Sequence, residues 1–352
     1  MLARFFSYTL LFLSITVAAQ NTKYSQLIVE AADFQKEGRF GAAIKKYDEI
    51  LLADNKNVNA WAEKAYSQVG LKEYKKAITT CKKALKIESS DTKSIKLVYT
   101  TYGNALDLEG HPKSALKMYN KGLTRFPEFY SLHYNKGVTL GGMNDFGGAI
   151  AAFQHSVQSR PSHAASFLAL GRMLEFKERN ISALLCYMRF HTIEPDSERA
   201  KENLKKVKDL MFSNVKKTSN DTLISNRSTS GLVELGGEEN PENSFQSVEL
   251  ILSMQSALDL GNNKGKKTEV ERFEEKLNSI FSIMEDTKDE NLGFYWDFLV
   301  PYFIELHQNE YEKVLAHLLY SNQDDFEVNE YLNNNEDSVR GFYDWSGTFE
   351  WK

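Results

Sequence analysis

Small and aromatic residues recur along the first half of the chain at a nearly fixed spacing. The small residues are alanines, separated by 34, 38, 34 and 34 positions: Ala43, Ala77, Ala115, Ala149 and Ala183. Four positions after each alanine stands a bulky or sulfur-containing apolar residue: Tyr47, Cys81, Tyr119, Phe153 and Tyr187. Residues four apart share one face of an α-helix. The pattern therefore predicts five copies of one helical unit.

A second row of small residues precedes the alanines by twelve positions, which predicts a partner helix in each unit. Its members are Ala31, Ala65, Gly103, Gly137 and Gly171. Small side chains let two helices approach closely, and the aromatic ring then fills the space beside them. Each unit ends on a polar residue or on a proline, which cannot continue a helix: Asn55, Ser89, Pro127, Pro161 and Pro195.

This arrangement resembles the tetratricopeptide repeat, a 34-residue helical hairpin. The resemblance covers residues 24–197 and implies an all-α fold, a right-handed α-solenoid of five hairpins. The additional four residues fall in the polar turn at 89–92. The expected repeats are 24–57, 58–91, 96–129, 130–163 and 164–197.

The remainder of the chain predicts a cap, a linker and a smaller helical domain. Residues 198–211 form a charged amphipathic pattern, which is typical of a helix that shields the last repeat from water. Residues 212–243 are rich in Ser, Thr, Asn and Gly and predict a linker. Helical spacing of apolar residues resumes over 246–325, where Pro301 should kink or restart a helix. The segment 309–318 resembles the start of a repeat's second helix, which implies one or two degenerate hairpins.

The last segment, residues 326–352, is acidic and ends in aromatic residues. The aromatic residues are Phe342, Tyr343, Trp345, Phe349 and Trp351. Exposed aromatic rings at a chain end are costly, so we expect them to dock. They dock either on the second domain or in the groove of the repeats, as an internal ligand.

The first 19 residues have the composition of a secretory signal peptide. Arg4 precedes an apolar stretch of about 15 residues, shorter than the ~20 that span a membrane, and small residues precede Gln20. We expect cleavage after Ala19. The Ala-Gln junction resembles those of exported Bacteroidetes proteins, which implies a periplasmic or secreted protein. An uncleaved leader would instead tether the protein to a membrane as an assembly factor.

Charge divides the mature chain into a basic body and an acidic remainder. Residues 20–211 carry 30 Lys and Arg against 21 Asp and Glu, whereas residues 212–352 carry 12 against 27. The imbalance favours attraction between the two parts or a charged partner. Because export removes the chain from nucleic acid, the lysine clusters of the repeats predict a solvated face. The two cysteines, Cys81 and Cys186, lie in different repeats and predict buried apolar residues rather than a disulfide.

Helix A of each repeat is expected to line a concave groove that binds a peptide or a partner helix. By family geometry, the groove-facing residues are Glu63, Tyr66, Thr100, Asn104, Asp107, Tyr134, Asn135, Arg172 and Glu175. For any one of them taken alone, an ordinary solvated residue is the favoured interpretation, because few surface positions carry binding energy. One subclass of the family clamps a C-terminal carboxylate, but Ala165 and Ala169 stand where its cations should be.

The sequence contains no motif for phosphate, dinucleotide or metal binding, and it predicts no cofactor. His307 and His317 are separated by ten residues across an expected turn, and a zinc site needs three or more convergent ligands. The main hypothesis is a non-enzymatic interaction scaffold with a protein or peptide partner. The alternative is a catalytic domain in 246–352 that the repeats target, which would require a pocket with convergent titratable groups there.

Overall fold

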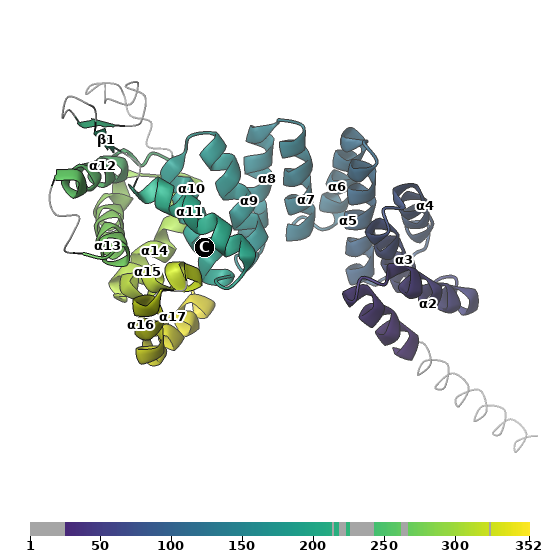
Figure 1. The fold of residues 1–352 in the computed structure, drawn as a ribbon. Helices are drawn as coiled ribbons and strands as arrows, with labels where there is room; N and C mark the ends of the chain where they lie inside the picture. The colour runs from purple at the N-terminus through teal and green to yellow at the C-terminus, as the bar shows by residue number, and fades with distance from the viewer. Residues whose placement is uncertain (1–24, 213–214, 218–222, 226–242, 262–266, 324) are drawn as a thin grey trace, which may run out of the picture. The chain divides into compact units, whose positions relative to one another are not determined.

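The computed structural model describes residues 25–212, 215–217, 223–225, 243–261, 267–323 and 325–352 (Figure 1). The expected signal peptide lies outside these residues. The described chain is helical apart from one short β-hairpin, which confirms the all-α fold class of consecutive helical hairpins. It forms two compact units, Met1–Gly148 and Ala149–Lys352.

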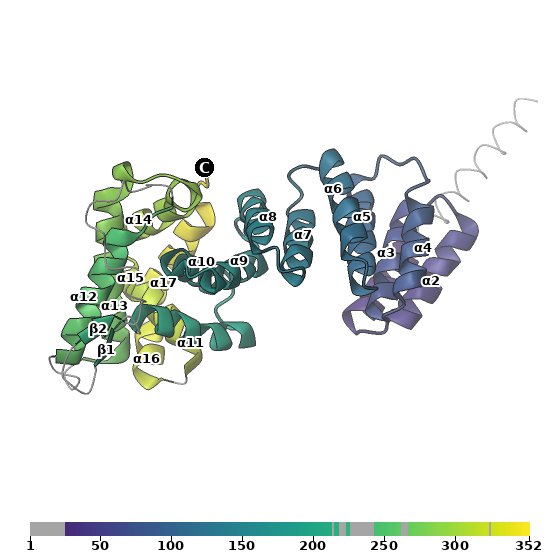
Figure 2. The ribbon, with the colours of Figure 1, turned by 90° about the horizontal axis from the view of Figure 1, so that it is seen from above.

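Each expected repeat contains two helices, which we call A and B in chain order. The first A helix covers residues 25–36. The others are α2 (Phe40–Ala53), α3 (Val58–Gly70), α4 (Tyr74–Ala84), α5 (Thr92–Leu108), α6 (Pro112–Arg125), α7 (Tyr130–Gly142), α8 (Phe146–Ser159), α9 (Ala164–Phe176) and α10 (Asn180–Ile193). Figure 2 shows these helices in succession from purple to teal.

The turn between helix A and helix B has the same geometry in every repeat. A residue with positive φ follows helix A at Gly38, Lys72, Gly110, Asn144 and Glu178. The amide of this residue donates to the carbonyl three residues earlier, and the next amide donates to the carbonyl five residues before it. This pair of bonds is the Schellman motif, which satisfies the last carbonyls of helix A.

The rows of small and aromatic residues meet inside the repeats. All five alanines of the first row are fully buried, and Tyr47, Tyr119 and Tyr187 are at most 1% exposed. A methyl group added at Gly103 would lie 2.1 Å from the Tyr119 ring, and one at Gly171 would lie 2.5 Å from the Tyr187 ring. Close approach of helix A to the ring on helix B therefore requires the small residue.

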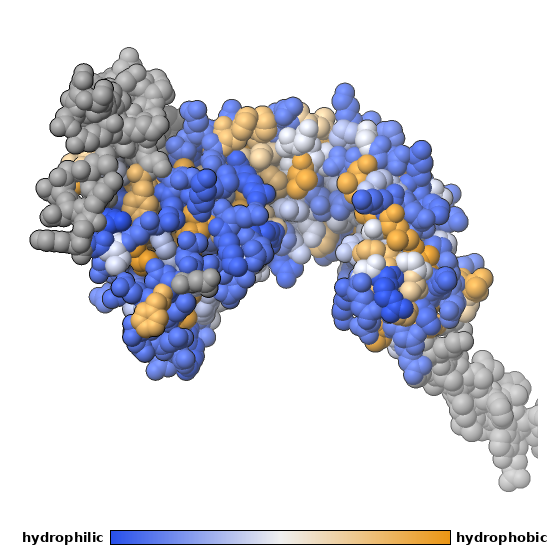
Figure 3. All heavy atoms as spheres, in the orientation of Figure 1, coloured by the Kyte–Doolittle hydropathy of each residue, from blue (hydrophilic) through white to orange (hydrophobic). Residues whose placement is uncertain are grey.

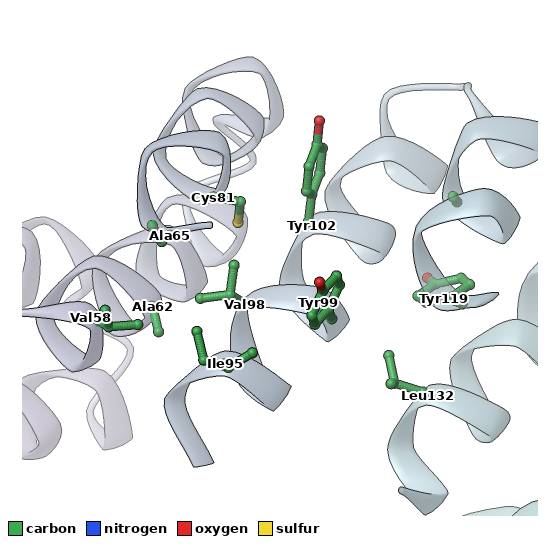
Figure 4. Close-up of a cluster of buried hydrophobic side chains, with 12 residues drawn as sticks. Val58, Ala62, Ala65, Cys81, Ile95, Val98, Tyr99, Tyr102, Tyr119 and Leu132 are labelled. Atoms are coloured by element: carbon green, nitrogen blue, oxygen red, sulfur yellow. The ribbon is translucent and has the colours of Figure 1, made fainter. Parts of the chain in front are cut away.

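In the first unit, helices α3, α4 and α5 share a hydrophobic cluster (Figure 4). Val98 of α5 packs with Ala62 and Ala65 of α3 and with Cys81 of α4, and all four are fully buried. Cys81 and Cys186 are both free thiols, as expected.

The second unit contains the cap and the C-terminal helices. These are α11 (Glu198–Phe212), α12 (Gln246–Gly261), α13 (Glu269–Thr287), α14 (Val300–Gln308), α15 (Glu312–Tyr320), α16 (Phe326–Asn334) and α17 (Glu336–Thr348). Helix α11 contacts α10 and buries Leu204, Val207 and Met211. Lys208 of α11 forms an ion pair with Glu269 of α13, 2.5 Å from Nζ to Oε1. This ion pair joins the cap helix to the acidic domain.

Pro301 restarts a helix, as expected. A π-helical segment, Tyr295–Leu299, precedes α14, and Pro301 occupies the first turn of α14, where its missing amide costs no hydrogen bond. Glu310, between α14 and α15, has positive φ. Its amide donates to the His307 carbonyl and the Tyr311 amide donates to the Leu306 carbonyl, so both Schellman bonds are repeated. The α14–α15 pair therefore keeps the turn of a repeat while Phe303 and Leu315 replace its small residues.

The expected linker is not structureless throughout. Residues Val215–Lys217 form strand β1, which pairs antiparallel with β2, Leu223–Ser225, in the register Lys216 to Ile224. Val, Leu and Ile favour strands. A three-residue strand is too short for period-two alternation to reveal it in sequence.

The acidic segment, residues 326–352, is largely helical and belongs to the second unit. Helices α16 and α17 contact α15, and Phe342 is fully buried. Trp345 stacks on Tyr302 of α14 at a centroid distance of 4.9 Å, and its Nε1 donates to Glu305. Trp351 stacks on the same Tyr302 at 5.3 Å. The expected docking on the second domain is therefore present.

Arg189 of α10 links the fifth repeat to this aromatic cluster. Its guanidinium lies 4.6 Å from the centroid of the Tyr302 ring and 5.0 Å from that of Trp351. Its Nη1 donates to the hydroxyls of Ser346, Tyr302 and Thr192. Helix α10 is buried on all sides from Ile181 to Thr192 because the C-terminal helices surround it.

Candidate functional site: the face of the A helices

The A helices of the first unit lie side by side, and side chains bond across each seam between them. Helix α3 contacts α5, and α5 contacts α7. Gln35 on the first A helix donates to Ser67 of α3 at 2.8 Å. Thr139 of α7 donates to Asp107 of α5 at 2.9 Å. The polar residues of this face therefore form a connected row across repeats.

Glu63 lies at the seam between the first two repeats. Its Oε2 accepts a bond of 3.3 Å from Gln35 Nε2. Burial raises the pKa of the Glu63 carboxyl, although the Gln35 bond and nearby Lys93 lower it. A half-buried carboxylate in a polar face can accept hydrogen bonds from a ligand's amides or cation.

Four other predicted residues use polar atoms within the protein. Asn104 Oδ1 accepts from the Tyr119 hydroxyl at 2.7 Å. Thr100 Oγ1 and Asn135 Nδ2 donate to carbonyls one turn earlier, at Lys96 and Ser131. Asp107 is bonded to Thr139, so Asn104 and Asp107 join neighbouring helices, whereas Thr100 and Asn135 bond within their own helix. A ligand would compete for these groups or use their remaining lone pairs.

Tyr66 is the predicted residue of the first unit that is most available to a ligand. Its side chain is 47% exposed on α3, one turn from Glu63. Tyr134 of α7 is half-buried. On the face drawn in Figure 3, the apolar residues of the first unit are scattered among hydrophilic ones. An exposed tyrosine beside polar groups suits recognition of a peptide.

Two predicted residues, Arg172 and Glu175, belong to α9 in the second unit. Arg172 is exposed, as is Phe176 one turn later. Glu175 accepts from the Tyr187 hydroxyl at 2.5 Å and pairs with Lys206 of α11 at 2.5 Å. The cap helix therefore occupies Glu175 and leaves Arg172 open.

Three residues that connect the A helices were not predicted from the sequence: Gln35, Ser67 and Thr139. Gln35 also accepts from the Tyr47 hydroxyl at 3.2 Å, so it links the aromatic row to the polar face. Tyr187 bonds to Glu175 in the same way, and both pairs are separated by twelve residues. A polar residue twelve positions before a tyrosine of the aromatic row was therefore the sequence signal that could have identified Gln35.

Two segments match family models described as tetratricopeptide repeat. They are residues 29–92 and residues 130–163. The chain contains tetratricopeptide repeats. The matched segments fall in the first, second and fourth helical pairs.

Solved structures, two of them described as TPR proteins, resemble the chain over about half its length. YrrB, a TPR protein with an unusual peptide-binding site, is 21% identical. The match covers 53% of this chain and 97% of YrrB, with a TM-score of 0.37. A protein of Thermus thermophilus is 15% identical over 52% and 98%, with a TM-score of 0.46. MamA of Desulfovibrio magneticus is 18% identical over 50% and 97%, with a TM-score of 0.40.

A search of curated proteins found no match. The structures named above give no support to the expected likeness with exported Bacteroidetes proteins.

The repeats are followed by a domain that contains a charged pocket. The pocket has a volume of about 570 Å³ and lies between α13, α15 and α16. Its titratable groups largely bond to one another or to the backbone: Tyr320 donates to Glu269, and His317 Nδ1 contacts the Lys313 carbonyl. Burial lowers the pKa of His317, and its ring lies 3.8 Å from that of Tyr331.

The two histidines do not converge. His307 bonds instead to the buried carboxylate of Glu312. Across the described ranges, no three His, Cys, Asp or Glu residues are grouped so that they could hold a metal ion. Nor does any described helix have the length and apolar character needed to cross a membrane.

Proposed function

We propose that this protein is an extracytoplasmic interaction scaffold that binds a peptide or a partner helix across its A helices. The observation that carries the proposal is Tyr66, an exposed aromatic beside the half-buried Glu63, on a face where the bonds Gln35–Ser67 and Thr139–Asp107 join neighbouring helices. A fixed polar face with an exposed aromatic anchor recognises an extended ligand at low cost in side-chain entropy.

Site-specific photocrosslinking tests the binding face. A photoreactive phenylalanine replaces Tyr66 in one variant and Leu52 in the other. Leu52 is the matched control because it lies on helix B, in α2, and is 88% exposed. We expect discrete protein adducts from position 66 in cells and none from position 52. Equal labelling from both positions, or none from position 66, would contradict the proposal.

The extracytoplasmic location rests on the composition of residues 1–19. Arg4, a short apolar stretch and the small residues Val17, Ala18 and Ala19 together support export with removal of the leader. Intact mass spectrometry of the protein purified from the host envelope tests this directly. A mature chain that begins at Gln20 is expected, and a chain that retains the leader would favour the tethered form.

A further inference from the structure

Helix α12 carries a row of exposed apolar residues that the fold does not use. Leu250, Met254 and Leu258 are 57%, 55% and 65% exposed. Their spacing of four places them along one side of the helix. The row borders a groove of about 600 Å³ between α12 and α13, whose apolar lining includes Ile251 and Ile283.

The contact between α12 and α13 is complete without this row. Val248 and Leu252, on the inner side of α12, are fully buried. Ser256 accepts a hydrogen bond from the buried Lys276 at 3.2 Å. Gln255 donates to Ser279 on α13 and closes the floor of the groove. Packing among the residues that the structure describes therefore does not explain these three exposed apolar residues.

One end of the groove is acidic. Asp286 lines it, and Asp289 and Glu290 follow on the surface where α13 ends. The C-terminus of a helix adds negative partial charge at the same place. The positive charge of Lys288 neutralises the charge of only one of these three carboxylates. An apolar groove with an acidic end complements a helix that has an apolar stripe and a basic end.

A second copy of this chain fits less well, because the segment 212–352 carries 12 basic against 27 acidic residues. Two such domains in contact would repel each other. We propose that the α12–α13 groove binds an amphipathic helix of another protein, with its apolar stripe on Leu250, Met254 and Leu258 and its Lys or Arg residues beside Asp286. This interface is separate from the face of the A helices.

A synthetic peptide provides the probe. It is a helix of about 16 residues with leucines three and four apart, neutral residues elsewhere and three lysines at one end. Fluorescence anisotropy with the mature full-length protein should give a Kd in the micromolar range. The same peptide with glutamates in place of the lysines should bind at least about tenfold more weakly. Failure of the basic peptide to bind, or equal binding of both peptides, would overturn the proposal.

Three variants locate the binding. Met254→Gln removes the centre of the apolar row, and Asp286→Lys reverses the charge at its end; each should weaken the basic peptide about tenfold. Leu292→Gln is the control, because Leu292 is 50% exposed but does not line the groove. Tyr66→Ala should leave the affinity unchanged, which separates this interface from the repeat face.

Two outcomes would reject the helix-binding groove. One is equal loss of affinity in Leu292→Gln and Met254→Gln. The other is a dimer in sedimentation equilibrium that Met254→Gln dissociates, because the occupant would then be a second copy. Circular dichroism of each variant should match that of the parent protein, since the substituted side chains are exposed.

Discussion

At the scale of the residue, Gly103 controls how closely helix A approaches helix B in the third repeat. An alanine there gains helix propensity, worth about 1 kcal/mol, but its methyl group would lie 2.1 Å from the Tyr119 ring. Overpacking of this kind costs roughly 1 to 3 kcal/mol, and a contact as short as 2.1 Å places Gly103 in the upper part of that range, above the gain in propensity. We predict that Gly103→Ala lowers the free energy of unfolding by about 1 to 2 kcal/mol in urea titration.

Two further variants separate crowding from a general effect of alanine. Gly142→Ala is the control, because no atom lies within 4 Å of the added methyl group, so stability should stay or rise. The second repeat pairs Ala65 with Cys81. In a Tyr119→Cys background, adding Gly103→Ala should therefore cause no further loss of stability relative to Tyr119→Cys alone. An unchanged penalty in that double variant would refute the steric explanation.

At the scale of the element, the turn after each A helix requires a left-handed residue that the sequence supplies unevenly. Gly38 and Gly110 adopt positive φ freely, whereas Glu178 holds a φ of 58° at a cost of roughly 1 kcal/mol. We predict that Glu178→Gly stabilises the second unit by about 0.5 kcal/mol, after the greater chain entropy of glycine is included.

The neighbouring residue provides the control for this turn. Lys177 has φ of −90°, which any residue adopts, so Lys177→Gly should destabilise by about 0.5 to 1 kcal/mol. Both effects are measured by chemical denaturation of the full chain. Glycine lowering stability equally at both positions would show that the Schellman turn is not under strain.

The periodicity of the sequence predicted the helical hairpins wherever the rows of small and aromatic residues are present. Where those rows are absent, the sequence was less informative about the hairpins. The α14–α15 hairpin keeps the same turn, but Phe303 and Leu315 hide it from a search for small residues. The predicted residues on the face of the A helices were assigned only from their positions within the repeat. Bonds such as Asp107 to Thr139 depend on how adjacent repeats stack, which one repeat's sequence does not encode.

At the scale of the whole molecule, the chain's end closes the second unit around the last repeat. The composition of the aromatic end was enough to predict that it docks. The residues that Trp351 contacts, Tyr302 and Arg189, lie 49 and 162 residues before it in sequence. Such contacts have no local signal. The opposite charges of the two halves predicted attraction, yet rings and hydroxyls, rather than carboxylates, surround Arg189.

Trp351 therefore should stabilise the second unit far more than its position near the terminus suggests. Its ring contacts Phe298, Tyr302 and Arg189. Truncating a buried Trp costs about 3 to 5 kcal/mol, and this ring is partly exposed, so Trp351→Ala should lower stability by about 2 to 3 kcal/mol. Hydrogen exchange should accelerate in α10 and α14 while α3 to α6 keep their protection, because solenoid stability depends on near neighbours.

Phe326→Ala is the matched control for this prediction, since Phe326 is aromatic, belongs to the same C-terminal segment and is 77% exposed. It should change stability by less than about 0.5 kcal/mol. If Trp351→Ala proves equally mild, or if exchange in α10 does not change, the C-terminal aromatic residues only cover the surface. If exchange rises in α10 as expected, the fifth repeat depends on the C-terminus for its own folding, because Arg189 loses an aromatic partner and α10 is exposed to water.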